Sequence, residues 1–302
     1  MPVPISKKLP EKEETPENLK PYYFHGIHLS VKGEEANGEC PFCSRDKFSV
    51  RVESGLYNCL VCGASGNGAK LLQELWKMFD EATDLHQYLV LAEDRDLQHN
   101  DTLVRWEVVY SSLCDEWMIP GYNKEGTLTQ LYRYTKVKDK LRLVPTPTFG
   151  HAIFGMSVYQ KSKPEIYLCE GPWDAMALWE VLSQVSIDND RNYTKAHRIA
   201  DSVSKEVSVL ATPGCNVFLD SWKPLFKGKS VTIFFDNDHP KINANTQQEI
   251  PPAGYSGVER IASILKGTVS ELNFVQWGPK GFDPSFPSGI DVRDVLSGAT
   301  NV

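Results

Sequence analysis

Two groups of residues in this sequence have types and spacings that suit metal chemistry: four cysteines near the N-terminus and a set of acids further along. The cysteines form two C-x2-C pairs separated by fifteen residues, at Cys40, Cys43, Cys59 and Cys62. This spacing supplies four thiolates to one tetrahedral Zn²⁺, and the residues between the pairs read as a hairpin that brings them together. A redox pair fits less well, because two pairs occur and neither has a strand–CxxC–helix context. The sequence therefore predicts one structural zinc ion.

The acids follow short apolar runs. Glu170 ends "EIYLCE", Asp174 follows where a helix is expected to begin, and Asp236 and Asp238 end "SVTIFFDND". Carboxylates ~5 Å apart repel each other by roughly 3 kcal/mol unless a divalent cation offsets their charge. Acids of this kind hold one or two Mg²⁺ ions for phosphoryl or nucleotidyl transfer, with Mn²⁺ as the alternative cation. For Asp174 taken alone, a helix cap or a surface acid is a natural alternative.

These acids need a sheet to bring them together. The apolar segments "EIYLCE", "EVSVLAT", "SVTIFFD" and "VSELNFVQW" read as strands with helical segments between them. Such alternation predicts the α/β class with a mostly parallel sheet, and sites in these folds lie at the carboxyl edge of the strands. Upstream, "AKLLQELWKMF" has the apolar spacing of a helix, and the segment that begins at Gly126 alternates like β-structure.

A basic stretch lies between the cysteines and the acids. Five positive charges occur within ten residues, and two tyrosines interleave with them: Arg133, Lys136, Lys138, Lys140 and Arg142, with Tyr132 and Tyr134. Cations beside exposed aromatic rings suit contact with nucleic-acid phosphates and stacking of bases. A solvated basic hairpin is the alternative interpretation.

Composition limits the remaining possibilities. The chain has 302 residues, a net charge of −7 and 41% hydrophobic residues, which is typical of a globular protein of two or three domains. No apolar run approaches the ~20 residues of a membrane helix, and the N-terminus lacks the apolar core of a secretory signal. We therefore expect a cytoplasmic protein with reduced cysteines, no membrane contact, and Cys169 and Cys215 without a nucleophilic role. His25 and His28 are expected to be ordinary surface or capping residues.

The pattern E-G-x-x-D-A from Glu170 to Ala175, followed by D-x-D at Asp236 and Asp238, resembles the TOPRIM domain of primases, topoisomerases and some nucleases. With the four-cysteine ribbon, the chain resembles DnaG-like and phage primases, especially the primase half of phage primase–helicases. The run "KLRLVP" resembles a lysine-containing element that precedes TOPRIM in these primases. The implied organisation is a flexible tail (1–20), a zinc ribbon (21–80), a linker (81–102), and an RNA-polymerase domain made of a basic subdomain (103–163) and TOPRIM (164–302).

The resemblance implies a DNA primase that makes short RNA primers on single-stranded DNA from nucleoside triphosphates, in a bacterial or phage-infected cell. It implies catalytic roles for Glu170, Asp174, Asp236 and Asp238, with Mg²⁺ on Glu170, Asp236 and Asp238. The sequence leaves open whether Glu170 binds metal or accepts a proton. The implied contacts to template or triphosphate are Arg133, Lys138, Lys140 and Arg142, and Asp291 and Asp294 are expected to support the acids indirectly.

The only "GKS", at Gly228–Ser230, lacks the other residues of a P-loop. The chain is therefore expected either to meet a replicative helicase in trans or to be the primase part of a longer protein. Two other classes of protein share these features. A recombination mediator of the RecR kind joins a four-cysteine zinc site to TOPRIM without catalysis, and a TOPRIM nuclease uses the same acids to hydrolyse a phosphodiester.

Overall fold

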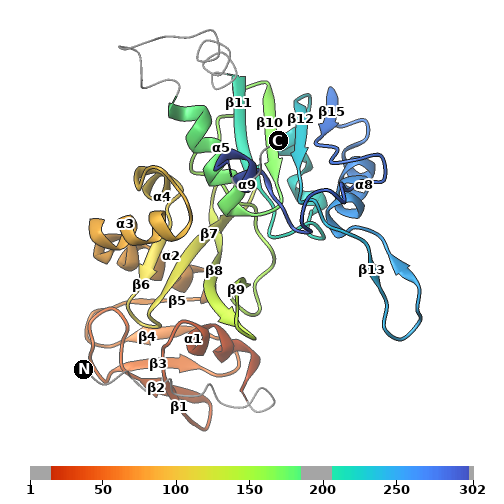
Figure 1. Cartoon of the computed structure of the whole chain (residues 1–302). Helices are drawn as coiled ribbons and strands as arrows, with labels where there is room; N and C mark the ends of the chain where they lie inside the picture. Colours follow the sequence, from red (N-terminus) through yellow and green to blue (C-terminus); the bar gives the residue numbers. More distant parts are fainter. Residues whose placement is uncertain (1–14, 185–205, 299–302) are drawn as a thin grey trace. The chain divides into compact units, whose positions relative to one another are not determined.

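The computed structural model describes residues 15–184 and 206–298, and these form two compact units (Figure 1). The first unit contains the described residues up to Thr83 together with Val109–Pro120 and Leu128–Gly150. The second contains Asp84–Val108, Gly121–Thr127 and the described residues from His151 onward. Residues 1–14 of the expected tail, and 185–205 and 299–302 of the expected TOPRIM segment, lie outside the described residues.

An antiparallel meander forms the N-terminal part of the first unit. Its strands pair in the order β1-β2-β3-β4-β5. The elements are η1 (Glu17–Leu19), α1 (Lys20–Phe24), β1 (Leu29–Lys32), β2 (Glu35–Gly38), β3 (Phe48–Arg51), β4 (Tyr57–Cys59) and β5 (Ser65–Gly66), followed by helix α2 (Gly68–Ala82). The hairpin expected between the cysteine pairs is β3–β4, in which Phe48 pairs with Cys59. That expectation and the helix expected in "AKLLQELWKMF" are confirmed.

One apolar cluster holds this unit together. Tyr22, Phe48 and Tyr57 pack with Leu75 and Phe79 of α2, and all five side chains are buried. Each fully buried side chain of this kind contributes about 1.5–3 kcal/mol. The Asn67 side chain accepts a hydrogen bond from the backbone N–H of Lys70 and so caps the start of α2. The ribbon and α2 therefore share a single core.

The ordered part of the chain begins earlier than expected. Residues 15–20 were predicted to belong to a mobile tail, and this is wrong, because Glu17–Leu19 form the helix η1 and Leu19 is fully buried in the ribbon core. A leucine that fills a core position stabilises the segment that carries it, whatever the polarity of its neighbours.

A second antiparallel sheet completes the first unit, with strand order β6-β7-β8-β9. Its strands are β6 (Val109–Ser111), β7 (Glu116–Tyr122), β8 (Leu128–Val137) and β9 (Lys140–Pro145). Val109 and Met118 belong to the same core cluster as the ribbon. Tyr132 is 1% exposed, so the expectation that it stacks on bases is wrong. Cys114 lies in the turn between β6 and β7.

His25 is fully buried, which corrects the expectation that it is a surface or capping residue, whereas His28 is exposed. The His25 Nε2 atom lies 3.0 Å from Thr146 Oγ1, and that hydroxyl donates its proton to the carbonyl of Leu131. Nε2 must therefore donate, which leaves Nδ1 as the unprotonated nitrogen. Burial, with a smaller contribution from the charge of Arg133, lowers the pKa of His25 to about 3.

This buried imidazole predicts a loss of stability in mild acid. Because the pKa of His25 is lower in the folded protein than its ordinary value near 6.5, the unfolded chain binds more protons between pH 6.5 and pH 3. The free energy of unfolding of the first unit therefore falls as the pH is lowered through this window, by roughly 2 kcal/mol from pH 7 to pH 5. We expect His25→Gln, which can still donate to Thr146, to flatten this dependence in urea titrations. His28→Gln should leave it unchanged, and equal pH dependence in all three proteins would contradict the assignment.

The second unit is built on a parallel sheet with strand order β11-β10-β12-β15. Its main elements are β10 (Glu165–Cys169), α5 (Pro172–Gln184), β11 (Val207–Ala211), η2 (Asp220–Trp222), α7 (Lys223–Phe226), β12 (Ser230–Phe234), α8 (Ala253–Leu265), β15 (Glu271–Phe274) and α9 (Val292–Leu296). A two-stranded hairpin of β13 (Lys241–Ile242) and β14 (Glu249–Ile250) lies between β12 and α8 in the sequence. The α/β class and the four expected strands are confirmed.

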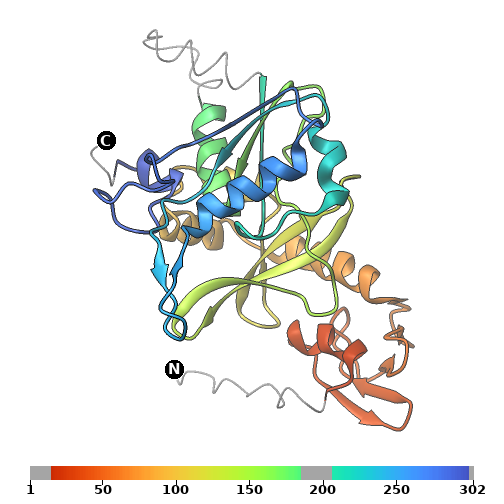
Figure 2. The same cartoon turned by 90° about the vertical axis from the view of Figure 1, so that its right-hand side faces the viewer.

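Helices α5 and α8 lie on opposite faces of this sheet, as Figures 1 and 2 show from two directions. On one face, Ile166 and Leu168 of β10 pack with Val231 and Ile233 of β12 and with Ile261 of α8. These strand residues alternate, which is the pattern of a strand that presents one side to each layer. Because all four strands are parallel, their carboxyl ends meet at one edge, and the acids follow two of these ends.

Part of the expected linker is a packed element. Within 81–102, helix α3 (Leu85–Asp94) buries Tyr88 and Leu91, and helix α4 (Asp101–Arg105) follows. The buried Glu180 carboxylate of α5 accepts hydrogen bonds from the backbone of Gln98 and His99 and from the Thr102 hydroxyl. These three bonds fasten the segment within the second unit. No described helix is long and apolar enough to span a bilayer.

Candidate active site and metal centre

The four cysteines of the ribbon meet at one point. Their sulfur atoms all lie within 4.8 Å of one another, with Cys40 Sγ 3.8 Å from Cys62 Sγ and Cys43 Sγ 3.7 Å from Cys59 Sγ. Tetrahedral zinc with Zn–S bonds of about 2.3 Å requires sulfur atoms about 3.8 Å apart. The residues therefore fit a four-thiolate Zn²⁺ site, as the spacing predicted.

The backbone of the two pairs is built alike. The N–H of Ser44 donates to the carbonyl of Cys40, and the N–H of Gly63 donates to the carbonyl of Cys59. Both donors have positive φ, 54° for Ser44 and 76° for Gly63, which glycine tolerates more easily than serine. The N–H of Cys62 points at Cys59 and lowers the pKa of that thiol to about 6, which favours the thiolate that a metal binds.

The acids converge at the carboxyl edge of the parallel sheet. Cys169 and Phe234 are register partners, so Glu170 and the segment that carries Asp236 leave the sheet side by side. The Asp236 N–H points at Glu170 Oε2 across 3.5 Å, and the Glu170 N–H donates to the carbonyl of Phe234. Asp238 Oδ2 accepts a hydrogen bond of 3.0 Å from the N–H of Gly254 at the start of α8.

Burial and mutual repulsion raise the pKa values of Glu170 and Asp236. Burial has the largest effect on Asp236, followed by the charge of Glu170, and together with the other acids they raise the pKa of Asp236 to about 10. For Glu170, burial and then Asp238 raise the pKa. Among the described residues, only the cysteines bring three or more ligand atoms as close together as 4.8 Å. The acids do not form such a group among the described residues, so Mg²⁺ binding by them stays a prediction.

Asp174 is held by α9. It is buried in the first turn of α5, where Pro172 occupies the first helical position, and it is hydrogen-bonded to Asp291. Two carboxyls share a hydrogen bond only if one is protonated, and burial followed by the charge of Asp291 raises the pKa of Asp174. Asp291 also caps α9 and accepts a bond of 3.2 Å from Arg293, so Arg293 stabilises this acidic pair.

Two contacts near Glu170 were not foreseen from the sequence. The thiol and the backbone N–H of Cys215 both donate to the Glu170 carboxylate and oppose the rise in its pKa. The carbonyl of Cys215 accepts a bond of 3.2 Å from Arg260 of α8. The Pro-Gly turn before Cys215 signalled a close approach of the backbone, but nothing in the sequence connected it to Glu170. Arg293 was likewise missed, although it stands between Asp291 and Asp294 in "DVRD".

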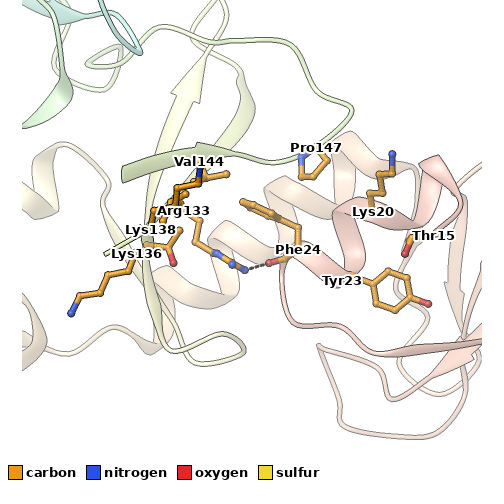
Figure 3. A pocket seen from close by; sticks show the side chains of 11 residues that line it. Thr15, Lys20, Tyr23, Phe24, Arg133, Lys136, Lys138, Val144 and Pro147 are labelled. Carbon is orange, nitrogen blue, oxygen red and sulfur yellow. Dashed lines mark hydrogen bonds between the residues drawn. The ribbon is translucent and has the colours of Figure 1, made fainter. Parts of the chain in front are cut away.

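The basic residues of the β8–β9 hairpin differ in what they contact. Arg133 forms an ion pair of 2.6 Å with Glu116, donates to the carbonyl of Phe24 (Figure 3), and lies 4.6 Å from the centre of the Phe24 ring. Lys138, Lys140 and Arg142 are exposed. The guanidinium of Arg133 is therefore engaged within the protein, whereas the other three cations face solvent. The predicted template contacts of all four stay predictions.

Comparison with known proteins bears on the ribbon. Residues 18–100 match the CHC2 zinc finger family, the zinc ribbon of DnaG. No curated protein sequence matches the chain.

Similar solved structures include three primases. The zinc-binding and RNA-polymerase domains of Aquifex aeolicus primase are 15% identical, with 90% of this chain and 80% of that chain covered and a TM-score of 0.44. The primase fragment of the bacteriophage T7 primase–helicase is 16% identical, with 86% and 93% covered and a TM-score of 0.45. The E. coli primase catalytic core is 13% identical, with 76% and 75% covered and a TM-score of 0.47.

Proposed function

We propose that this protein is a DNA primase, a DNA-directed RNA polymerase that makes short RNA primers on single-stranded DNA from nucleoside triphosphates. The observation that carries the proposal is the convergence of Glu170, Asp236 and Asp238 at the carboxyl edge of a parallel sheet, in a chain whose N-terminal part matches the DnaG zinc ribbon. Nucleotidyl transfer needs such acids, and a ribbon of this family suits a nucleic-acid substrate.

In the proposed reaction, the 3′-oxygen of one nucleotide forms a bond to the α-phosphorus of the next, and the bond to pyrophosphate breaks. Glu170, Asp236 and Asp238 would hold one or two Mg²⁺ ions, which would supply positive charge to the triphosphate. The proton of the 3′-hydroxyl passes to water or to Glu170, whose buried carboxyl has a raised pKa and so a greater affinity for protons. Asp174, bonded to Asp291, holds the start of α5 next to this edge.

The proposed partners follow from the same function. Exposed Lys138, Lys140 and Arg142 are suited to the phosphates of the template or of a triphosphate. A replicative helicase is a proposed partner. Gly228–Ser230 is not a P-loop, because it leads into strand β12 and the Lys229 ammonium is bonded to the carbonyls of Lys161 and Lys163. A primase works beside replicating DNA, so the proposed location is the cytoplasm of a bacterial or phage-infected cell.

The test is a synthesis assay. Zinc-loaded protein is incubated with Mg²⁺, labelled ribonucleoside triphosphates and single-stranded templates that cover all trinucleotides. Short RNA that depends on the template would support the proposal and reveal any recognition sequence. Cleaved DNA without RNA synthesis would instead identify the protein as a nuclease. DNA binding without either product, even with a replicative helicase added, would favour the recombination mediator.

A further inference from the structure

Asn237 stands between the two acids of the D-x-D pattern and is not itself one of the candidate catalytic residues. Its side chain is fully buried, whereas Asp236 and Asp238 on either side of it are partly exposed. The N–H of Asp238 donates to the carbonyl of Asp236 at 2.9 Å, which closes a three-residue turn centred on Asn237. The asparagine side chain therefore lies inside the protein, while the acids on both sides of it remain accessible.

Both the side chain and the backbone of Asn237 are bonded to one segment, residues 283–290. The side-chain Oδ1 accepts a bond of 2.8 Å from the N–H of Asp283, and the side-chain amide donates to the Asp283 carbonyl at 3.1 Å. In the backbone, the N–H of Asn237 donates to the carbonyl of Ile290 at 2.8 Å, and its carbonyl accepts from Gly289 at 2.9 Å. Asn237 thus fastens this segment to the turn that follows β12.

The segment consists of turns, and its surface is mostly open to solvent. Ile290 is buried, whereas five of the residues before it are exposed: Pro284, Ser285, Pro287, Ser288 and Gly289. His239 adds two bonds, from its N–H to Ser288 Oγ at 2.9 Å and from its Nε2 to the Asp283 carbonyl at 3.2 Å. Hydrogen bonds to the residues after β12 therefore fix the segment more than apolar packing does.

The segment leads directly to a second pair of acids. The residue that follows it is Asp291, which caps α9 and is hydrogen-bonded to Asp174 at the start of α5. Asp236 and Asp238, in contrast, follow strand β12. Asn237 is therefore a hydrogen-bonded link between the turn that carries one pair of acids and the segment that ends beside the other pair.

An amide suits this place for a physical reason. The Asp283 backbone requires one donor and one acceptor from the side chain at position 237, and asparagine offers both without charge. An ionised aspartate of the same size could not donate, and it would bury a further negative charge beside acids that already repel one another. Alanine at this position would leave the Asp283 N–H and carbonyl without these partners.

We propose that Asn237 is a positioning residue, which fixes the Asp174–Asp291 pair relative to Asp236 and Asp238 by holding the segment 283–290 in place. Its side chain acts through this segment and touches neither substrate nor metal. The proposal rests on the proposed function only in assigning these acids to metal-assisted nucleotidyl transfer. The link itself is a feature of the fold and can be measured without catalysis.

The first test uses the unmodified full chain, loaded with zinc. If the link couples the two pairs of acids, Mn²⁺ bound at the acids should slow hydrogen exchange at the N–H groups of Asp283 and Gly289 by at least about fivefold, the lower end of typical coupling between sites. The N–H of Gln160, bonded to Ser208 at the amino end of the sheet, should exchange equally with and without Mn²⁺. Exchange at Asp283 that is indifferent to bound Mn²⁺, measured by NMR, would overturn the proposal.

The second test removes the side-chain amide. Asn237→Ala should weaken Mn²⁺ binding by about 10–100-fold, the range for loss of a residue that supports metal ligands from outside, as measured by electron paramagnetic resonance. It should also speed exchange at the N–H of Asp294, which the Asp291 carboxylate caps. Unchanged Mn²⁺ affinity together with unchanged exchange at Asp294 would overturn the proposal. If this variant does not fold, the measurement on the unmodified chain decides.

Ser208→Ala is the matched control for a merely structural effect. The buried Ser208 hydroxyl makes the same two-way contact with the backbone of one loop residue, because it donates to the Gln160 carbonyl and accepts from the Gln160 N–H at 3.1 Å each. This variant should lose protection at Gln160 and keep its Mn²⁺ affinity and its exchange at Asp294. Equal weakening of Mn²⁺ binding in both variants would show a general loss of stability and contradict the positioning role.

These outcomes are separable from the proposed function. RNA synthesis by the unmodified protein, with Mn²⁺ affinity and Asp294 exchange unaltered in Asn237→Ala, would leave the primase and remove the positioning role. Absence of RNA synthesis or of Mn²⁺ binding in the unmodified protein would count against the primase. In that case, faster exchange at Asp294 in Asn237→Ala but not in Ser208→Ala would still establish the link, and equal exchange would overturn it.

Discussion

Glu170→Gln is expected to lower template-dependent RNA synthesis by roughly 10²–10⁴-fold, the range for loss of a positioned acid or base, while leaving the fold intact. The substitution removes a carboxylate that would share in metal binding or accept the proton of the 3′-hydroxyl. In the absence of metal, burial and the charge of Asp238 oppose ionisation of the Glu170 carboxyl. The substitution removes this unfavourable charge. The free energy of unfolding of the second unit should therefore stay the same or rise, so lost activity would not reflect lost folding.

The measurement pairs RNA synthesis with urea unfolding, in Mg²⁺ and in EDTA. Asp220→Asn is the matched control, because Asp220 is an exposed acid of the same unit with a side chain 80% accessible, and it should retain full synthesis. Glu170→Gln protein that still makes RNA at an undiminished rate would remove this carboxyl from the reaction. A large fall in unfolding free energy would show instead that Glu170 is structural.

Removal of zinc is expected to have the largest effect on stability. Apparent binding of structural zinc is worth on the order of 10–16 kcal/mol in small zinc domains, so loss of one thiolate should unfold the ribbon. Because Val109 and Met118 share the ribbon core, the loss should extend to β6 and β7. Cys40→Ser should therefore abolish stoichiometric zinc and lower protection from hydrogen exchange in Phe48 and Val109 together.

Cys114→Ser provides the control for the zinc prediction. This cysteine is half-buried in the same unit, and its thiol donates to the Ser111 hydroxyl rather than joining the metal site. It should retain one zinc per chain and normal exchange, measured by atomic emission and by mass spectrometry. If exchange rises in the ribbon alone after zinc loss, the two sheets do not depend on one another as the shared core implies.

The zinc site could be predicted because its four ligands lie close together in the sequence. Two short pairs on either side of one hairpin fix the ligands, and the hairpin itself follows from alternating residues between polar turns. The acids were predictable for a different reason. Parallel strands end at a common edge, so identifying the strands before Glu170 and Asp236 was sufficient to place both acids there.

The local environment of each side chain could be learned only from the tertiary structure. Asp174 is bonded to Asp291 on α9, and Cys215 reaches Glu170 from the turn after β11, contacts that no local pattern encodes. His25 and Tyr132 are buried although both side chains carry polar groups. A core position is defined by what packs on it from elsewhere in the chain, so sequence spacing alone could not reveal it.

The basic hairpin shows both contributions together. The sequence by itself determined that positive charge gathers there, because five cations fall within ten residues. The tertiary structure decided on which face of the hairpin each of them lies. Strand register places Lys140 and Arg142 on one face and Lys136 on the other, and Glu116 and Phe24 engage Arg133. The physical reason is that the number of charged side chains follows from composition, whereas the face of the hairpin on which each one lies depends on the pairing between strands.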